Sequence, residues 1–187
     1  MQFTVGSVGF FKDGKVIPRT APLDILLACD SATLKITNQK NGRMGQVIHQ
    51  EAVTTSKYNP IAALAYQVHH ILSNRGTTET LLCTYFDNGT ENCVTSKQIV
   101  RAVRTAAKIL KLQDVAIDPD LVGSHSLRSG GAMALRLHGE DATTIMKLGR
   151  WTSTTFLDYI HTQIAHLSKG VSTRMSEDIP FLNIAAF

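Results

Sequence analysis

The sequence has few aromatic residues, few charges, few cysteines and no long apolar run. Its longest apolar stretch, residues 23–29, is interrupted by Asp24 and is far shorter than the roughly 20 residues that span a membrane. We therefore expect no membrane partner. Charged residues make up 18% and hydrophobic residues 43% of the chain, a balance that excludes a disordered, highly charged polymer and predicts a folded core.

The cysteines, Cys29, Cys83 and Cys93, are odd in number and too few for the disulfide framework of a small secreted protein. Residues 1–11 show neither a basic region nor a continuous apolar stretch, so no secretory signal is readable. We expect reduced thiols, no metal and an intracellular location, the nucleus if the source is eukaryotic. The alternative is a disulfide or metal role for the Cys83/Cys93 pair with His69 and His70, although these residues match no known ligand spacing.

The length of 187 residues fits one domain with its own hydrophobic core. The formal net charge is +4 and the sequence pI is about 9.1, which is a mild preference for polyanions. Basic residues are spread over both halves of the chain. An anion site must therefore be built by folding and not by a basic tail.

The first sixty residues combine short apolar segments with glycines and prolines, a pattern typical of strands and turns, and we expect no helix there. The clearest hairpin is predicted over residues 33–48, where Asn41-Gly42 separates two segments. Asn-Gly favours a type I′ turn because both central residues need positive φ. This places Lys40 at the tip of a β-hairpin.

Helices are expected in the rest of the chain. Asn59-Pro60 supplies an N-cap and a first-turn proline for a helix to about Asn74. The spacing Thr95-x-x-Gln98 forms a capping box before a second long helix. Three more helices, each ended by a glycine, are expected from about 126 to 138, from 142 to 148 and from 153 to 169, followed by a tail over 171–187.

The second long helix has two distinct faces. Its expected buried face is apolar and comprises Ile99, Val100, Val103, Ala106, Ala107 and Leu110. The opposite face carries a basic stripe at steps of three and four residues, formed by Lys97, Arg101, Arg104, Lys108 and Lys111. A solvated helix surface explains this stripe, and a row of contacts to DNA phosphates explains it equally well.

Three short motifs follow one another in the C-terminal half. The first is His125-Ser126-Leu127-Arg128, the second is Gly149-Arg150-Trp151, and the third is Tyr159 within an apolar helical pattern. In this order, with a helix between the first two, they resemble the catalytic boxes of the tyrosine recombinases, the phage-integrase family. The hairpin around Lys40 is similar to the one that presents the family's active-site lysine. The residues of these boxes are most similar to those of recombinase-like sequences of eukaryotic mobile elements.

The resemblance implies a mainly helical α+β catalytic domain over residues 1–170, a helical bundle with a small antiparallel sheet at its N-terminal side. It implies DNA recombination or integration by strand cleavage, with double-stranded DNA and other recombinase protomers in a synaptic complex as partners. Tyr159 would attack the phosphodiester, Arg128, His125 and Trp151 would contact the phosphate, and Lys40, with Lys35 as its rival, would protonate the leaving oxygen. The phosphotyrosine ester stores the bond energy, so the family needs no cofactor and no metal.

The sequence departs from the family pattern in three respects. The family has another arginine on a helix before the hairpin, whereas this chain offers only Arg19 next to Pro18. The family's separate N-terminal core-binding domain is missing, so we expect a domain that is incomplete at its N-terminus. The step from Trp151 to Tyr159 is one residue shorter than in many bacterial members. The alternative is a DNA-binding remnant without catalysis, which would keep the duplex contacts expected from the basic stripe and Arg150.

Overall fold

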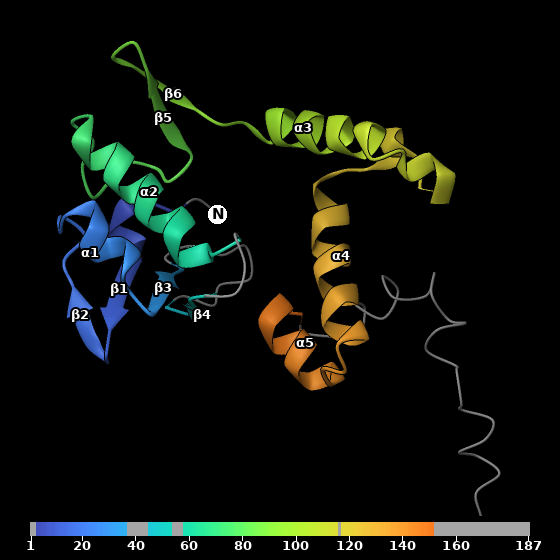
Figure 1. Ribbon diagram of the computed structural model, residues 1–187, viewed down its shortest axis with the longest axis horizontal. Helices are drawn as coiled ribbons and strands as arrows, with labels where there is room; N and C mark the ends of the chain where they lie inside the picture. The colour runs from blue at the N-terminus through green and yellow to red at the C-terminus, as the bar shows by residue number, and fades with distance from the viewer. Residues whose placement is uncertain (1–2, 37–44, 54–57, 116, 152–187) are drawn as a thin grey trace, which may run out of the picture. The chain divides into compact units, whose positions relative to one another are not determined.

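The computed structural model describes residues 3–36, 45–53, 58–115 and 117–151. In these residues the fold is α+β, with helices α1 to α5 and a small antiparallel sheet in the N-terminal part, as the sequence predicts (Figure 1). The chain divides into two compact units, Met1–Ala102 and Val103–Phe187, and each is described by itself. The single domain expected over residues 1–170 stays a prediction.

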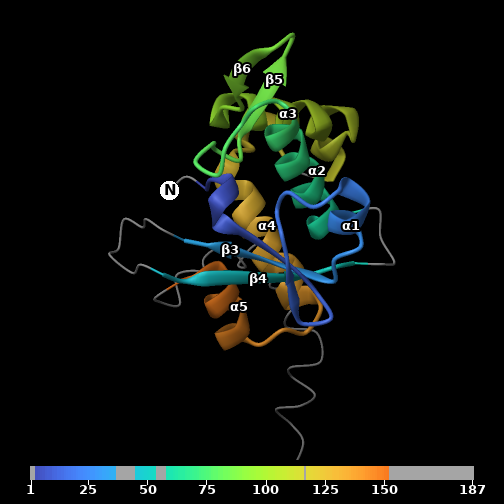
Figure 2. The same cartoon turned by 90° about the vertical axis from the view of Figure 1, so that its left-hand side faces the viewer.

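The N-terminal unit contains a four-stranded antiparallel sheet in the order β2-β1-β3-β4. Its strands are β1 (Val8–Lys12), β2 (Lys15–Ile17), β3 (Ser31–Lys35) and β4 (Val47–Glu51). Asp13 and Gly14 connect β1 to β2 with positive φ at both residues, the conformation that a tight hairpin turn needs. Figure 2 shows β3 and β4 side by side.

The predicted hairpin over residues 33–48 is confirmed in its strands. Leu34 lies opposite Ile48 and Lys35 opposite Val47. Beyond the strands, the Ile36 N–H donates to the Gln46 carbonyl (2.8 Å) and the Gly45 N–H donates to the Ile36 carbonyl (3.1 Å). The tip with Asn41, Gly42 and Lys40 lies outside the described residues.

The expectation of no helix in the first sixty residues is wrong at α1 (Leu23–Leu27). This short helix begins after Pro22, whose fixed φ suits a helix start, and the Ala28 N–H closes it on the Asp24 carbonyl (3.1 Å). Leu26 is fully buried between the sheet and the next helix. Burial of one large side chain favours this helical turn, whereas the glycines and prolines of the first sixty residues indicated only strands and turns.

The helix predicted from Asn59-Pro60 is confirmed as α2 (Pro60–Ser73). The Asn59 Oδ1 atom accepts the Ile61 N–H at 2.9 Å, which satisfies one of the free donors at the helix start. Its buried face packs against Phe10 and Leu26, and it consists of Ile61, Ala65, Val68 and Ile71. This apolar cluster is the core of the N-terminal unit.

A second hairpin, β5 (Thr84–Asp87) and β6 (Thr90–Cys93), packs beside α2. Asn88 and Gly89 form its turn with φ values of 48° and 78°, as a type I′ turn requires. Two polar residues of α2 hold β5. Gln67 donates to the Leu82 and Thr84 carbonyls, and His70 Nε2 accepts the Phe86 N–H at 3.2 Å.

The capping box predicts α3 (Ser96–Ile109) correctly. The Thr95 N–H donates to Gln98 Oε1 (2.7 Å) and the Gln98 N–H donates to Thr95 Oγ1 (3.3 Å). The predicted buried face is largely wrong, because Ala107 is buried whereas Ile99 is 44% and Leu110 is 69% exposed. Helical spacing predicts which side chains share a face, but it does not predict whether another element covers that face.

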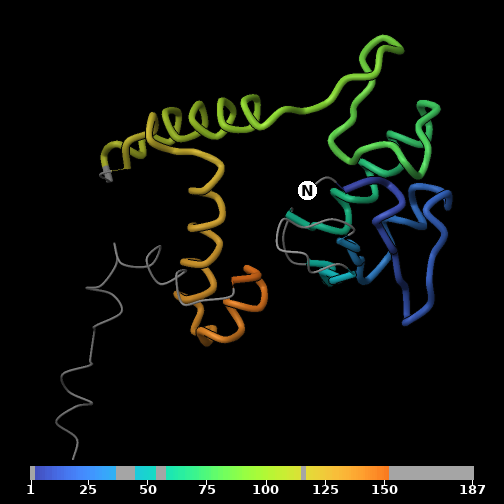
Figure 3. Tube along the Cα trace, turned by 180° about the vertical axis from the view of Figure 1, so that it is seen from behind, coloured from blue at the N-terminus to red at the C-terminus, as the bar shows by residue number. Residues whose placement is uncertain are grey.

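The C-terminal unit contains α4 (Ser124–Leu137) and α5 (Ala142–Gly149), which pack together (Figure 3). Helix α4 starts two residues earlier than predicted, so His125 lies inside its first turn. Its last residue is Leu137, and Gly139 two residues later has a φ of 89°, the left-handed conformation expected of a C′ glycine. Ala132 and Ile145 form the small buried core between these helices, next to Met133, Leu135, Met146 and Trp151.

None of the helices in the described part of the chain combines the length and the hydropathy that a membrane span requires.

Asp141 caps α5 and gives the fold a pH dependence. Its Oδ1 accepts the Thr143 and Thr144 N–H groups, and its Oδ2 accepts the Thr144 hydroxyl (2.6 Å), which lowers the pKa of the carboxyl together with the backbone bonds. A carboxyl whose pKa is lower in the folded than in the unfolded state, where it is near 3.9, stabilises the fold at pH values above 3.9, and this contribution is lost as the pH falls through the folded pKa.

We expect Asp141→Asn to be less stable than the wild type at pH 7 in urea unfolding, and the difference in the free energy of unfolding between the two proteins to shrink toward pH 3. A gap that does not change with pH would contradict this assignment.

Candidate functional site

The guanidinium of Arg128 lies over the ring of Trp151, with 4.5 Å from its carbon to the ring centroid. Its Nη2 atom donates to the Gly149 carbonyl at 2.5 Å. The sequence placed Arg128 and Trp151 in two separate boxes, and the packing of α4 against α5 brings them into contact. We name the cluster of Arg128, Gly149 and Trp151 the arginine corner.

Gly149 is a glycine because the Trp151 ring occupies the place of a side chain. A Cβ atom at Gly149 would lie 1.6 Å from Trp151 Cζ3 and 1.9 Å from Cε3. No side chain fits there unless the ring moves. Since the same ring faces Arg128, residue 149 controls where the guanidinium is held.

The backbone at the end of α5 directs Trp151 back toward the helix. Arg150 adopts the left-handed conformation, with φ of 56°, and its N–H donates to the Lys147 carbonyl at 3.2 Å. The Trp151 N–H donates to the Met146 carbonyl at 2.9 Å, so the two bonds form a Schellman motif. A left-handed residue other than glycine carries strain of about 1 kcal/mol, and such positions cluster at functional sites.

His125 is exposed in the first turn of α4, three residues before Arg128. Residues three apart lie on the same helix face, so His125 and Arg128 project from one side of α4. The Ser126 hydroxyl accepts the Gly123 N–H at 3.0 Å and fixes the helix start. This half of a capping box sets the position of His125.

A cavity of about 480 Å³ adjoins the arginine corner. Its wall is mostly apolar, and Leu127, Leu135 and Leu148 line it beside the three corner residues. Among the described residues, Arg128 donates one hydrogen bond, from Nη2 to the Gly149 carbonyl, which leaves the Nε–H, both Nη1 hydrogens and the second Nη2 hydrogen for a ligand. Arg128 is exposed, so its charge-assisted N–H groups are accessible to an anion from solvent.

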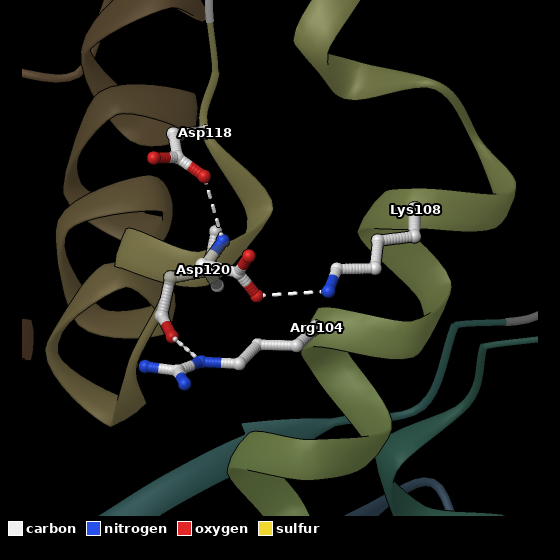
Figure 4. A network of polar contacts seen from close by, with 5 residues as sticks. Arg104, Lys108, Asp118 and Asp120 are labelled. Atoms are coloured by element: carbon white, nitrogen blue, oxygen red, sulfur yellow. Dashed lines mark hydrogen bonds and ion pairs between the residues drawn. The ribbon is translucent and has the colours of Figure 1, made fainter.

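The structure separates the basic stripe into two parts. Lys97 and Arg101 are exposed on α3. In contrast, Arg104 Nε donates to the Val122 carbonyl (2.8 Å) and Lys108 Nζ pairs with Asp120 (2.9 Å), as Figure 4 shows. The pairing with Lys108 lowers the pKa of the Asp120 carboxyl, mainly through their hydrogen bond. Arg104 and Lys108 therefore anchor the segment after α3, and binding a phosphate would compete with these bonds.

The exposed part of the stripe gives a test of duplex binding. Each lysine or arginine that neutralises a phosphate contributes about 0.9 to the slope of log K against log salt. We expect Lys97→Gln with Arg101→Gln to weaken duplex binding and to flatten that slope by about two. The control is Lys12→Gln with Lys15→Gln, an equal charge change at the β1–β2 hairpin. Unchanged affinity and slope in the α3 variant would show that this face is only solvated.

Of four other candidate residues, the structure describes two, Lys35 and Arg19. Tyr159 and Lys40 lie outside the described residues. Lys35, the rival for the lysine role, is the exposed last residue of β3. Arg19 donates through Nη2 to the Gly6 carbonyl (2.9 Å) and through Nε to the Val8 carbonyl, so its side chain holds the start of β1. The described residues contain no group of three or more His, Cys, Asp or Glu side chains that could hold a metal ion.

Two sets of contacts were not predicted from the sequence. Gly149 was expected to end a helix and to belong to the second box, and the structure shows that it also accepts from Arg128 and leaves room for the Trp151 ring. Asp120 pairs with Lys108, and no local pattern links these residues. The signal for Gly149 was its position two residues before the only tryptophan of the chain.

Comparison of the chain with protein-family models, curated proteins and solved structures gives no match.

Proposed function

We propose that this chain binds double-stranded DNA and breaks and rejoins it as the tyrosine recombinases do. The observation that supports the proposal best is the contact between Arg128 and Trp151. The residues of two recombinase-like boxes share one corner, where the guanidinium is held by a stack and a hydrogen bond. A preorganised cation of this kind is what a phosphodiester needs during displacement.

The arginine corner would bind the phosphate that reacts. A guanidinium presents parallel N–H groups that match two non-bridging phosphate oxygens. The bond to Gly149 and the stack on Trp151 hold Arg128 in advance, so little ordering remains when DNA binds. His125, on the same face of α4, would donate to the same phosphate or carry a proton.

The proposed cleavage step conserves atoms and charge. The Tyr159 hydroxyl passes its proton to His125 or to a water molecule, and its oxygen attacks phosphorus, which forms a 3′-phosphotyrosine bond. The bond from phosphorus to the 5′ oxygen breaks, and that oxygen takes a proton from Lys40. Rejoining is the reverse reaction with a new 5′ hydroxyl, so no external energy source is needed.

One observation favours a second candidate function, duplex binding without cleavage. Arg19 is the only arginine before the hairpin, and its bonds to the Gly6 and Val8 carbonyls occupy it. Removing one charge-stabilising donor typically slows a reaction by about a hundred- to a thousand-fold. A chain without the second arginine would still bind DNA through Arg128, Arg150 and the exposed part of the stripe.

Covalent trapping separates the two functions. On a nicked suicide duplex the cleaved end diffuses away and the protein stays attached to DNA. We expect the full chain to form this adduct slowly, and Tyr159→Phe to form none while binding the duplex with unchanged affinity. An adduct formed equally by Tyr159→Phe would refute the nucleophile. Duplex binding with no adduct from the wild type would support the second candidate.

A further inference from the structure

Cys83 and Cys93 meet at the open end of the β5–β6 hairpin and take no part in the arginine corner. Their Sγ atoms lie 2.7 Å apart as free thiols, about 0.7 Å more than the length of a disulfide bond. Cys93 pairs with Thr84, so these two side chains lie on the same face of the hairpin. Because successive residues of a strand point to alternate faces, Cys83 would lie on the other face in a regular strand. However, residues 81–84 form a turn in which the Thr84 N–H donates to the Leu81 carbonyl, and this turn directs Cys83 toward Cys93.

The backbone around both thiols is held in place. Gln67 Nε2 on α2 donates to the carbonyls on either side of Cys83, at 2.8 Å to Leu82 and 2.6 Å to Thr84. The Val94 N–H, next to Cys93, donates to the Cys83 carbonyl at 2.8 Å. Because these bonds already fix the two chain segments, joining the sulfurs requires little further ordering.

The three cysteines differ in their access to a reagent. Cys93 is exposed, Cys83 is half-buried and Cys29 is buried in the core. The hydrogen bond with Cys93 raises the pKa of the Cys83 thiol, and partial burial raises it further. A solution reagent therefore reaches Cys93 first, and Cys83 is placed to react second.

We propose that Cys83 and Cys93 form a reversible intramolecular disulfide by exchange with a low-molecular-weight disulfide such as oxidised glutathione. The Cys93 thiolate attacks one glutathione sulfur, forms a mixed disulfide and releases the first glutathione thiolate. Cys83 then loses its proton, attacks Cys93 Sγ and releases the second. The two protons of the cysteine thiols end on two glutathione thiols, so one disulfide is reduced for each one formed.

The bond would fasten the hairpin immediately before α3. It joins residues ten apart in the sequence, and Thr95, two residues beyond Cys93, caps the helix. Closing a loop of this size restricts the opened state, so local opening of the hairpin becomes rarer by up to about a hundred-fold. Oxidation would thus make the start of α3 more rigid without changing its charge.

The test treats the full chain with oxidised glutathione and measures its intact mass and its free thiols after unfolding. We expect the wild type to lose two hydrogens, carry no glutathione and keep one alkylatable thiol, Cys29. Hydrogen exchange of the β5–β6 amides should then slow by up to about a hundred-fold. Three free thiols, a retained glutathione or a disulfide-linked dimer would each overturn the proposal.

Single variants test the order of the steps. Cys83→Ser should stop at the mixed disulfide and retain one glutathione on Cys93. Cys93→Ser should react far more slowly than the wild type, because the exposed thiol is gone. Cys29→Ala is the matched control and should form the bond as the wild type does. If Cys83→Ser lost its glutathione as readily as the wild type, another residue would be resolving the adduct.

Discussion

Replacing Arg128 by lysine is expected to slow covalent adduct formation on a nicked suicide duplex by about a hundred- to a thousand-fold. Lysine keeps the positive charge but offers a compact ammonium in place of a planar fork. It cannot stack flat on Trp151 while donating to the Gly149 carbonyl, as the guanidinium does. The measurement is the single-turnover rate at saturating duplex.

The control for this prediction is Arg136→Lys, two turns later on α4. Arg136 is exposed and makes one long bond, 3.4 Å, to the Glu140 carbonyl. We expect this variant to cleave at the wild-type rate, and both lysine variants to bind duplex nearly as tightly as the wild type. An Arg128→Lys rate within ten-fold of the wild type would show that the fork is not used in the reaction.

Replacing Gly149 by alanine is expected to destabilise the protein and disrupt the arginine corner. In a helix, alanine is normally favoured over glycine by about 1 kcal/mol. Here the new methyl group would overlap the Trp151 ring, and overpacking of this kind costs about 1–3 kcal/mol. The sign of the change in the free energy of unfolding therefore shows whether the Trp151 ring occupies the space next to Gly149. A displaced ring would also release the stack on Arg128, so covalent adduct formation should slow as well.

Gly130→Ala is the matched control for Gly149→Ala. Gly130 lies within α4, and a methyl group added there would meet nothing within 4 Å outside its own helix backbone. We expect this variant to be more stable than the wild type by about 0.8–1.0 kcal/mol in urea unfolding. If Gly149→Ala were stabilising by a similar amount, the contact between Trp151 and Gly149 would be absent in solution.

Sequence patterns predicted the elements that are set by neighbouring residues. Asn59 and the Thr95–Gln98 box each cap a helix where expected, because a cap acts over two or three residues. Gly139 ends α4 for the same local reason. The β3–β4 strands followed from alternation around one turn signal, although the tip that carries Lys40 lies outside the described residues.

The features that depend on distant residues could not be predicted. Helix α1 forms where the sequence predicted strands and turns, because Leu26 is buried there, and the apolar face of α3 is mostly exposed. Arg104 and Lys108 belong to an apparent phosphate row in the sequence, yet they anchor Val122 and Asp120. The two boxes contain Arg128 and Trp151 separately, but their stacking and the role of Gly149 follow from how α4 packs on α5.

The measurement that tests the arginine corner most directly is the quenching of tryptophan fluorescence by acrylamide, with and without duplex DNA. Trp151 is the only tryptophan of the chain, so the whole signal comes from this corner, and acrylamide is neutral, so charge does not steer it. If the corner holds a phosphate, saturating duplex lowers the quenching constant at low salt, added salt restores it, and Arg128→Gln weakens the effect. Duplex that binds by an independent assay and leaves the quenching constant of Trp151 unchanged would contradict a phosphate site at the arginine corner.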